Sequence, residues 1–217
     1  MKLKLSKPFH NKHAQGTYDK DLPKVFVIGH NKTATRSIDL LFKLSNYRAL
    51  HWDRNNLAKT IRSNFKSNLP LLTYIDDYHC YSDMEIHGEF YAYELFPLFD
   101  LQYPNSLFIY NKRNVSDWIN SRKNHGTYVS DYQKKFNSRN NKKLMTTEEV
   151  ELHWKQFFEN HEKHVLTYFK SKDNLIQLNI ESEQSQQDLI LRLKNAGFKI
   201  KESLKLLPIT GVTAKTQ

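Results

Sequence analysis

The chain has 217 residues, of which 39% are hydrophobic and 13% aromatic, so we expect one packed domain and exclude a largely disordered chain. Lysine and arginine outnumber aspartate and glutamate by 33 to 23, and the net charge of +10 permits an anionic partner without identifying one. The single cysteine, Cys80, excludes an intramolecular disulfide and fits a reducing compartment. No apolar run has the length of a signal-peptide core or the roughly 18 residues of a membrane span, so we expect a soluble, cytoplasmic protein without a transmembrane segment.

The first predicted unit is a strand, a turn and a helix. Residues 1–22 form a polar leader, and one domain is expected over residues 23–217. The run KVFVIG at 24–29 is short, apolar and β-branched, which is typical of a buried parallel strand. The segment TRSIDLLFKL at 35–44 places its apolar side chains on one helical face.

Two further strands are predicted in the first half of the chain. LPLLTYIDD, Leu69–Asp77, is an apolar run that ends in two acids, and SLFIYNKR, Ser106–Arg113, follows the turn residues YPN. Between them, YAYELFPLFDLQ has helical spacing, and Pro97 either begins the regular helix or kinks it.

The second half of the chain alternates in the same way. A helix is predicted from Val115, and the Asn-, Ser-, Lys- and Tyr-rich stretch Gly126–Lys143 lacks periodicity and is expected to be a surface excursion. This excursion belongs to a basic loop or lid at about 122–145. Thr146 and Glu149 form a capping-box pattern that opens a long helix.

The last predicted elements are a strand and a capped helix. NLIQLNI, Asn174–Ile180, has the composition of a strand, and a helix from about Gln184 to Ala196 ends at Gly197. Strands that alternate with helices indicate an α/β domain with a mainly parallel central sheet and helices on both faces. Ligands of such sheets bind beyond the carboxyl ends of the strands, where the first turn lies.

That turn, GHNKTATRS, has the composition of an anion site. Unpaired N–H groups at a helix start, with the positive end of the helix dipole behind them, favour phosphate or sulfate. Lys32 adds a charge, and Thr33, Thr35 and Ser37 add hydroxyl donors. The alternative is an ordinary helix start whose hydroxyls satisfy the first turn. The spacing is not that of a Walker A loop, which argues against ATP.

A second phosphate site is indicated by FIYNKRNVSDWINS. Arg113 stands at the end of a predicted strand and Ser121 two helical turns later, so an arginine fork and a hydroxyl converge at the sheet edge. With VIGHNKTATRS, this motif resembles the bacterial-type P-loop sulfotransferases, whose donor is 3'-phosphoadenosine 5'-phosphosulfate (PAPS). The resemblance covers about residues 24–125. In that family an Arg and a Ser eight positions apart hold the 3'-phosphate, and positions 113 and 121 have this separation.

The resemblance implies a P-loop-type domain with a defined donor site. The loop residues that would bind the 5'-phosphosulfate are Asn31, Lys32, Thr33, Ala34, Thr35, Arg36 and Ser37. Lys32 would contact the sulfate and the bridging oxygen, while Arg113 and Ser121 would recognise the 3'-phosphate.

Three features depart from the family pattern. Ala34 stands where a glycine is usual, which implies strain if φ is positive there. Arg36 stands where a second threonine is usual, so it either adds a charge to the donor site or faces solvent. TGVTAKTQ, 210–217, is a poor match to the family's C-terminal phosphate-binding loop, and the basic stretch Arg122–Lys143 is an alternative source of that contact.

The catalytic base is expected after the strand that precedes the Arg-bearing one, in YIDDYHCYSDMEIHG. Asp83 is the first candidate because YSDM resembles an acidic segment of bacterial family members. His79 is the second, since cytosolic members use a histidine in the comparable region, and Asp77 is the third. Each of them is also compatible with an ordinary polar loop residue.

These features predict a sulfotransferase that moves a sulfuryl group from PAPS to a hydroxyl or amine acceptor and releases PAP, adenosine 3',5'-bisphosphate. Lys32 and the base are its catalytic residues. Family analogy favours a carbohydrate or glycolipid acceptor. No metal is expected, because His161 and His164 lack a third ligand at a suitable spacing.

Two alternatives stay open. One is a small-molecule phosphotransferase in which LLTYIDD serves as a Walker B strand, although the G-K-[ST] signature is missing. The other is a nucleic-acid-binding module, against which the scattered basic charge argues, so no nucleic-acid partner is expected.

Overall fold

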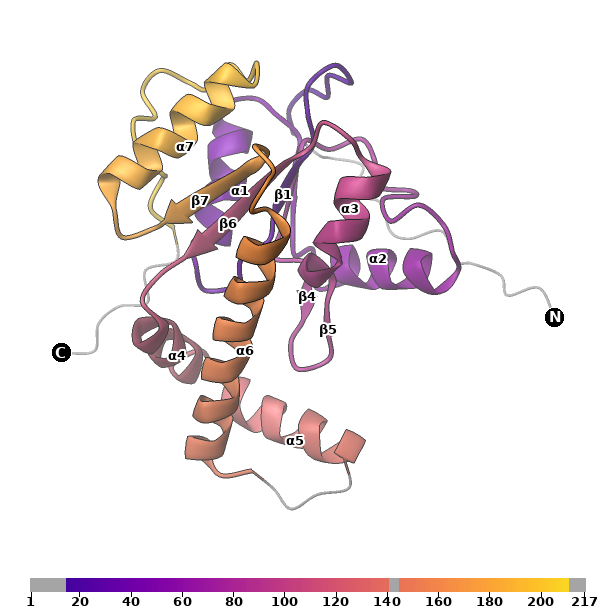
Figure 1. Cartoon of the computed structure of the whole chain (residues 1–217), viewed down its shortest axis with the longest axis vertical. Helices are drawn as coiled ribbons and strands as arrows, with labels where there is room; N and C mark the ends of the chain where they lie inside the picture. The colour runs from indigo at the N-terminus through magenta and orange to yellow at the C-terminus, as the bar shows by residue number, and fades with distance from the viewer. Residues whose placement is uncertain (1–14, 141–144, 211–217) are drawn as a thin grey trace.

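The computed structural model describes residues 15–140 and 145–210. At its centre lies a parallel sheet of five strands in the order β2-β3-β1-β6-β7 (Figure 1). The strands are β1 (Val25–Val27), β2 (Ala49–His51), β3 (Cys80–Ser82), β6 (Leu107–Lys112) and β7 (Leu175–Asn179). A separate antiparallel hairpin is made by β4 (Glu85–Ile86) and β5 (Phe90–Tyr91). The predicted α/β class with a parallel central sheet is confirmed.

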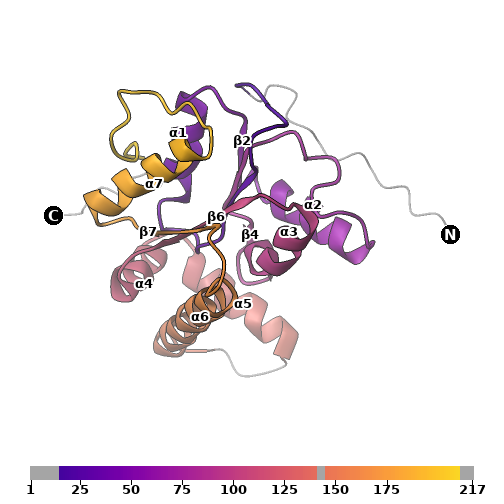
Figure 2. The same ribbon diagram turned by 45° about the horizontal axis from the view of Figure 1, so that its top comes forward.

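Helices cover both faces of this sheet, as predicted (Figure 2). The helices are α1 (Thr35–Leu44), α2 (Asn56–Lys66), η1 (Ala92–Leu95), α3 (Phe96–Gln102), α4 (Val115–Lys123), α5 (Tyr128–Asn140), α6 (Thr147–Tyr168) and α7 (Glu183–Asn195). α1 and α7 pack on one face, and α2, α3 and the end of α6 pack on the other.

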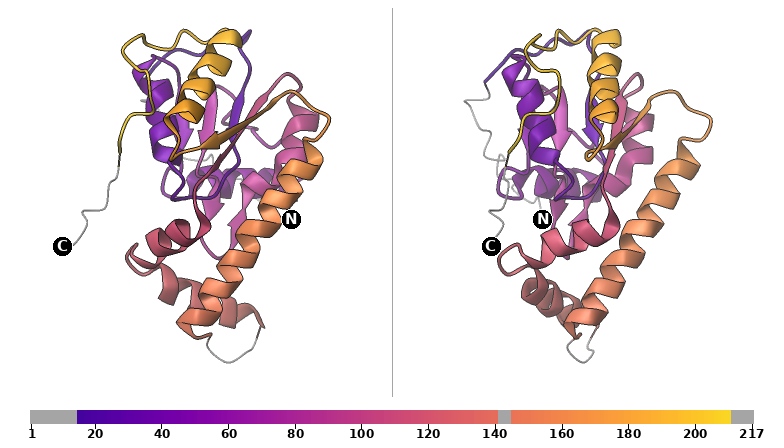
Figure 3. Two further views of the ribbon diagram at one scale, coloured as in Figure 1. Left: turned by 60° about the vertical axis from the view of Figure 1, so that its left-hand side comes forward. Right: turned by 90° about the vertical axis from the view of Figure 1, so that its left-hand side faces the viewer.

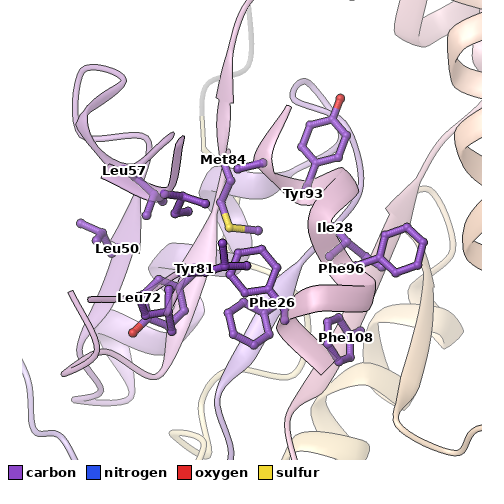
Figure 4. Close-up of a cluster of buried hydrophobic side chains, with 14 of the residues drawn as sticks. Phe26, Ile28, Leu50, Leu57, Leu72, Tyr81, Met84, Tyr93, Phe96 and Phe108 are labelled. Carbon is purple, nitrogen blue, oxygen red and sulfur yellow. The ribbon is translucent and has the colours of Figure 1, made fainter. Parts of the chain in front are cut away.

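The side chains of β1 and of Ile28, the residue that follows it, alternate between two hydrophobic clusters. Phe26 and Ile28 point to the α2 and α3 side, where Figure 4 shows Phe26 among the other aromatic side chains. Val25 and Val27 point to the α1 and α7 side. All four are fully buried, which explains why the strand has an uninterrupted apolar sequence.

A third cluster lies beyond the carboxyl end of β6. Trp118 of α4, Tyr132 of α5 and Trp154 of α6 pack together there. Both views of Figure 3 show α4, α5 and the first half of α6 grouped at this end of the molecule. These helices form a wall beside the edge of the sheet at which a ligand is expected.

Several predicted elements are confirmed at their ends. Thr146 and Glu149 form the reciprocal capping box that opens α6. Pro97 lies in the first turn of α3, directly after the 3-10 turn η1, so it begins the regular helix and does not kink it. Gly197, with a φ of 97°, follows α7.

The predicted strand over Leu69–Asp77 is wrong. This segment forms turns, and the strand that pairs with β1 on this side is β3. Its apolar residues Leu71, Leu72 and Ile75 are buried in the cluster beneath α2 and α3 without any strand pairing. A short apolar run has no period that separates such a buried turn from a strand.

The predicted surface excursion over Gly126–Lys143 is wrong for most of its length. Residues 128–140 form α5, and residues 141–143 lie outside the described part of the chain. Tyr128, Tyr132 and Phe136 follow one another at helical spacing and face α4 and α6. These three aromatic side chains and Val129, in a polar background, were too few to reveal the helix. β2, α2 and the β4–β5 hairpin were not predicted.

Candidate active site

The loop between β1 and α1, residues 29–34, lies at the carboxyl edge of the sheet. Gly29 is required at its start, because a Cβ there would lie 2.1 Å from the carbonyl oxygen of Asn111. Lys32 and Ala34 are left-handed, with φ angles of 64° and 63°. An L-residue in this conformation costs about 1 kcal/mol. The strain that the sequence implied at Ala34 is therefore present.

The side chain of Asn111, on β6, holds this loop in place through hydrogen bonds. The Gly29 N–H donates to Asn111 Oδ1 at 2.9 Å, and Asn111 Nδ2 donates to the Thr33 carbonyl at 2.7 Å. The buried Thr33 hydroxyl donates to the carbonyl of His30. The Thr33 side chain therefore stabilises the loop, and only its backbone can face a ligand. Sequence analysis missed Asn111, whose one signal was a polar residue inside an apolar strand.

Asn31 is the link between the loop and the helical wall. Its Nδ2 donates to Glu85 Oε1 at 2.7 Å, and its Oδ1 accepts from Arg122 Nη1 at 2.9 Å. Its carbonyl accepts the indole N–H of Trp118 at 2.9 Å. These bonds use both the nitrogen and the oxygen of the side-chain amide, so Asn31 fixes the β1–α1 loop against β4 and α4.

Glu85 and Arg122 are both buried, with exposed fractions of 2% and 1%, and each is hydrogen-bonded to the side chain of Asn31. The guanidinium carbon of Arg122 lies 4.7 Å from the ring centroids of both Trp118 and Trp154. Burial raises the pKa of Glu85, and the charge of Arg122 opposes that rise. Glu85 was not predicted as part of a site, and Arg122 was named only as the first residue of the basic stretch Arg122–Lys143. Because Arg122 is buried here, it does not serve as the predicted additional contact for the 3'-phosphate.

The start of α1 has the features of an anion site. Ala34, the residue that caps the helix, has no side chain with which to accept an N–H. The first turn contains no acid. This weakens the alternative of an ordinary capped helix start, and it leaves N–H groups and the positive dipole end for a ligand.

The side chains in the first turn of α1 differ in burial and in their neighbours. Thr35 and Ser37 are buried, and Ser37 Oγ lies 3.1 Å from Thr210 Oγ1. The remainder of TGVTAKTQ, residues 211–217, lies outside the described residues. Arg36 is exposed, and its charge lowers the pKa values of Asp39 and His51.

Lys32 lies among both positively and negatively charged side chains. Burial lowers its pKa, the charge of Asp83 opposes this, and the charges of Arg122 and Arg113 reinforce it. Its Nζ is 3.2 Å from Nδ1 of His125. The structure therefore brings Lys32 together with Asp83 on one side and Arg113 on the other.

Arg113 and Ser121 follow β6 on the side of the loop away from β3. Arg113 Nη2 lies 3.4 Å from Glu181 Oε1, and its Nε is buried with no hydrogen-bond partner in the described part of the chain. Ser121 is half-buried on α4, one residue before Arg122. An unpaired buried N–H of an arginine is the kind of group that a bound anion would satisfy.

Asp83 directly follows β3 at the same edge of the sheet. Burial and the charge of Glu85 raise its pKa to about 8, although Arg122 and Lys32 oppose the shift. Its φ of 54° is left-handed, so the turn after β3 is strained. Asp83 is the one of the three base candidates that lies beside Lys32.

The structure does not bring His79 and Asp77 to this site. Both precede β3, and the carbonyl of His79 accepts the N–H of Val25 at the opposite, amino edge of the sheet. His79 Nε2 accepts the backbone N–H of Asp19 at 2.9 Å. Asp77 pairs with Arg48 at 2.6 Å. Both side chains therefore have structural partners far from the β1–α1 loop.

The comparisons with known proteins agree with this geometry. The sulfotransferase domain family matches residues 24–186, from the residue before β1 into α7. The chain belongs to the sulfotransferase family. A comparison with curated proteins finds no match. The family match confirms the resemblance and gives the domain a general activity in sulfuryl transfer.

Within residues 15–140 and 145–210, no three His, Cys, Asp or Glu side chains are grouped so that they could hold a metal ion. No helix in the same ranges is both long and apolar enough to cross a membrane.

Proposed function

We propose that this sulfotransferase moves the sulfuryl group of PAPS to a hydroxyl or amine of its acceptor and releases PAP. The observation that carries the proposal is the uncapped start of α1, with Lys32 beside it and Arg113 and Asp83 on opposite sides. An anionic donor would satisfy both the free N–H groups of α1 and the unpaired Nε of Arg113.

The donor spans the edge of the sheet in this proposal. The N–H groups of residues 33–37 bind the 5'-phosphosulfate, and Arg113 with Ser121 binds the 3'-phosphate. Asn31 and Thr33 position the loop through their side chains instead of contacting the donor. A cytoplasmic location stays a prediction.

Lys32 and Asp83 carry the chemistry. The acceptor oxygen attacks sulfur in line, a new S–O bond forms, and the bond to the PAP phosphate oxygen breaks. Lys32 neutralises negative charge on the transferring group and on the leaving oxygen. Asp83 takes the proton of the acceptor hydroxyl, and its pKa near 8 suits a base that works close to neutral pH.

A carbohydrate or glycolipid is the proposed acceptor class. Trp52 follows β2, next to the β3 end that carries Asp83, and its side chain is 43% exposed. The C–H face of a sugar ring is apolar and fits the electron-rich face of an indole. Trp52 supports this acceptor class on the Asp83 side of the site, opposite Arg113.

The phosphotransferase alternative loses its main support. The segment that would have been its Walker B strand forms turns, and its last acid, Asp77, is paired with Arg48. No contact among the described residues favours the nucleic-acid-binding alternative.

Calorimetric titration of the purified protein with PAP, beside ATP with magnesium, tests the proposal. We expect PAP to bind and ATP to bind far more weakly, and we expect Lys32→Ala and Arg113→Ala each to reduce PAP affinity. A preference for ATP, or no PAP binding at all, would count against a PAPS-dependent enzyme.

A further inference from the structure

The end of β2 places a histidine beside the proposed catalytic base. β2 and β3 are neighbouring parallel strands in which His51 is paired with Ser82, the residue before Asp83. His51 Nε2 lies 3.6 Å from Asp83 Oδ2, and each side chain is 18% exposed. His51 was absent from the predicted site because a lone histidine in an unpredicted strand gave no signal.

The separation of the two side chains suits a shared ligand better than a mutual bond. A direct hydrogen bond between nitrogen and oxygen spans about 2.7 to 3.2 Å, which is shorter than this contact. A single oxygen atom at about 2.8 Å from both atoms fits between a pair that is 3.6 Å apart. A hydroxyl placed there would accept a hydrogen bond from one of the two side chains and donate a hydrogen bond to the other.

The hydrogen bond between Ser82 and His51 identifies Nε2 of His51 as a hydrogen-bond donor. The Ser82 side chain is fully buried, and within the described residues its hydroxyl has His51 Nδ1 as its hydrogen-bond partner, at 2.9 Å. A buried hydroxyl proton needs an acceptor, and Nδ1 provides it. The proton of the neutral ring is then on Nε2, which faces Asp83. Burial, with the charges of Lys43 and Arg36, lowers the pKa of His51 to about 4, so the ring is neutral at pH 7.

The backbone after His51 is held in a costly conformation. Trp52, Asp53, Arg54 and Asn55 all have left-handed φ angles, between 46° and 67°. The Trp52 N–H donates to the Ser82 carbonyl at 3.1 Å, which fixes the end of β2 against the end of β3. Clustered strain of this kind occurs at functional sites, where the surrounding structure compensates for it.

We propose that His51 is a second acceptor-binding residue, which donates its Nε2–H to the acceptor hydroxyl oxygen while Asp83 Oδ2 accepts the proton of that hydroxyl. This inference rests on the proposed sulfuryl transfer. As the S–O bond forms, the proton passes to Asp83, the oxygen lone pair becomes the new bond, and the leaving electrons stay on PAP. His51 keeps its own proton and fixes the direction of the lone pair, so it acts as a catalytic residue that touches the acceptor.

The first test determines directly which ring nitrogen of His51 carries the proton. Nitrogen-15 NMR of the full chain, with PAP present and with His51 assigned through His51→Gln, is expected to show the proton on Nε2 at pH 7.5. Asp83→Asn should shift the Nε2 resonance, whereas Asp77→Asn, at the amino edge of the sheet, should leave it in place. A ring with its proton on Nδ1 would overturn the proposal.

The second test measures turnover as the release of PAP from PAPS, with water in the place of the acceptor. We expect His51→Ala to lower kcat at least tenfold while PAP affinity is unchanged, and His51→Gln, which keeps an N–H donor, to retain more activity. His164→Gln, an exposed position on α6, is the matched control and should behave as the wild type. An unchanged kcat in His51→Ala would refute the role of His51. Failure of the wild type to bind PAP would instead refute the proposed function.

Discussion

Arg122 Nη1 donates to Asn31 Oδ1 at 2.9 Å, and this bond joins helix α4 to the residue directly before Lys32. Asn31 in turn donates to Glu85, on the hairpin that begins two residues after Asp83. The loop that carries Lys32, the helix that carries Ser121 and the segment that carries Asp83 therefore share one buried network. Sites that must hold reacting groups in place depend on such supporting contacts.

The first prediction concerns the stability of this network. Arg122→Met removes the donor to the buried Asn31 Oδ1 and the guanidinium nitrogen that lies 2.8 Å from His87 Nδ1, and leaving such groups unpaired costs about 1 to 3 kcal/mol each. Denaturant unfolding should show this loss in the free energy of unfolding. Lys123→Met is the control, because Lys123 pairs with Glu151 at the surface and such pairs contribute at most about 1 kcal/mol. Equal losses in the two variants would contradict a structural role for Arg122.

The second prediction separates the two ends of the donor. Arg113→Ala should weaken binding of PAP by about 10- to 100-fold, the usual effect of losing a charged hydrogen bond. It should leave binding of adenosine 5'-phosphosulfate, which has no 3'-phosphate, nearly unchanged. Calorimetry with both ligands distinguishes the cases, and an equal loss for both would place Arg113 at the other end of the donor.

The sequence predicted the scaffold of this site better than its supporting contacts. The strand and helix around the β1–α1 loop were readable because a buried parallel strand and an amphipathic helix have different apolar periods. Lys32 and Arg113 became candidates because they lie in the first turn and at the end of a predicted strand, and Asp83 became one because YSDM resembles a segment of bacterial family members. Arg122 and Glu85 were missed because nothing in a sequence marks a charged residue as buried.

The errors have the same origin. The buried turn at Leu69–Asp77 has the composition of a strand, and α5 is polar apart from three aromatic side chains and Val129. His79, four residues from Asp83 in sequence, was a candidate because cytosolic family members use a histidine in the comparable region. The intervening strand β3 separates the two, since a residue that precedes a strand and one that follows it lie at opposite edges of the sheet. The position of β3 must be known before Asp83 can be distinguished from His79 as a candidate base.

The third prediction is a pH dependence of turnover. Burial and the charge of Glu85 raise the pKa of Asp83 to about 8, and in the proposed mechanism the ionised form is the base. We therefore expect kcat to rise about tenfold per pH unit below pH 8 and to level off above it. Asp83→Asn should lower kcat strongly and remove this rise. A wild-type rate that is flat from about pH 6 to about pH 9, a range that spans this pKa of about 8, would exclude Asp83 as the base.

The stability of the same variant provides an independent check. The folded pKa of Asp83 lies above its usual value of 3.8, so the protein loses stability as the pH rises from about 4 to about 8 and the carboxyl ionises. Asp83→Asn removes this ionisation. Relative to the wild type, the variant should therefore be more stable at alkaline than at acidic pH, by about 1 to 2 kcal/mol after solvent screening. Thermal unfolding at both pH values measures the difference.

The fourth prediction concerns the strain at Ala34. Its φ of 63° suits glycine, so Ala34→Gly should stabilise the protein by about 0.5 to 1 kcal/mol and leave PAP affinity nearly unchanged. Ala58→Gly, inside α2, is the matched control and should destabilise the protein by about 1 kcal/mol or more. If Ala34→Gly destabilised the protein as much as the control, the left-handed conformation of the loop would be wrong.

The fifth prediction tests the acceptor side of the site through Trp52. Trp118 and Trp154 are buried, so Trp52 is the tryptophan that a dissolved quencher such as acrylamide can reach. Because Trp52 lies on the side of Asp83, PAP should leave this quenching unchanged. Trp52→Ala should retain PAP affinity and PAPS hydrolysis but lose sulfuryl transfer to neutral oligosaccharides, followed with radiolabelled PAPS. Trp52→Phe, which keeps an aromatic face, should retain most of that transfer. A loss of PAP affinity in Trp52→Ala would mean that the indole binds the donor's adenine, and the acceptor would then have to be sought elsewhere along the sheet edge.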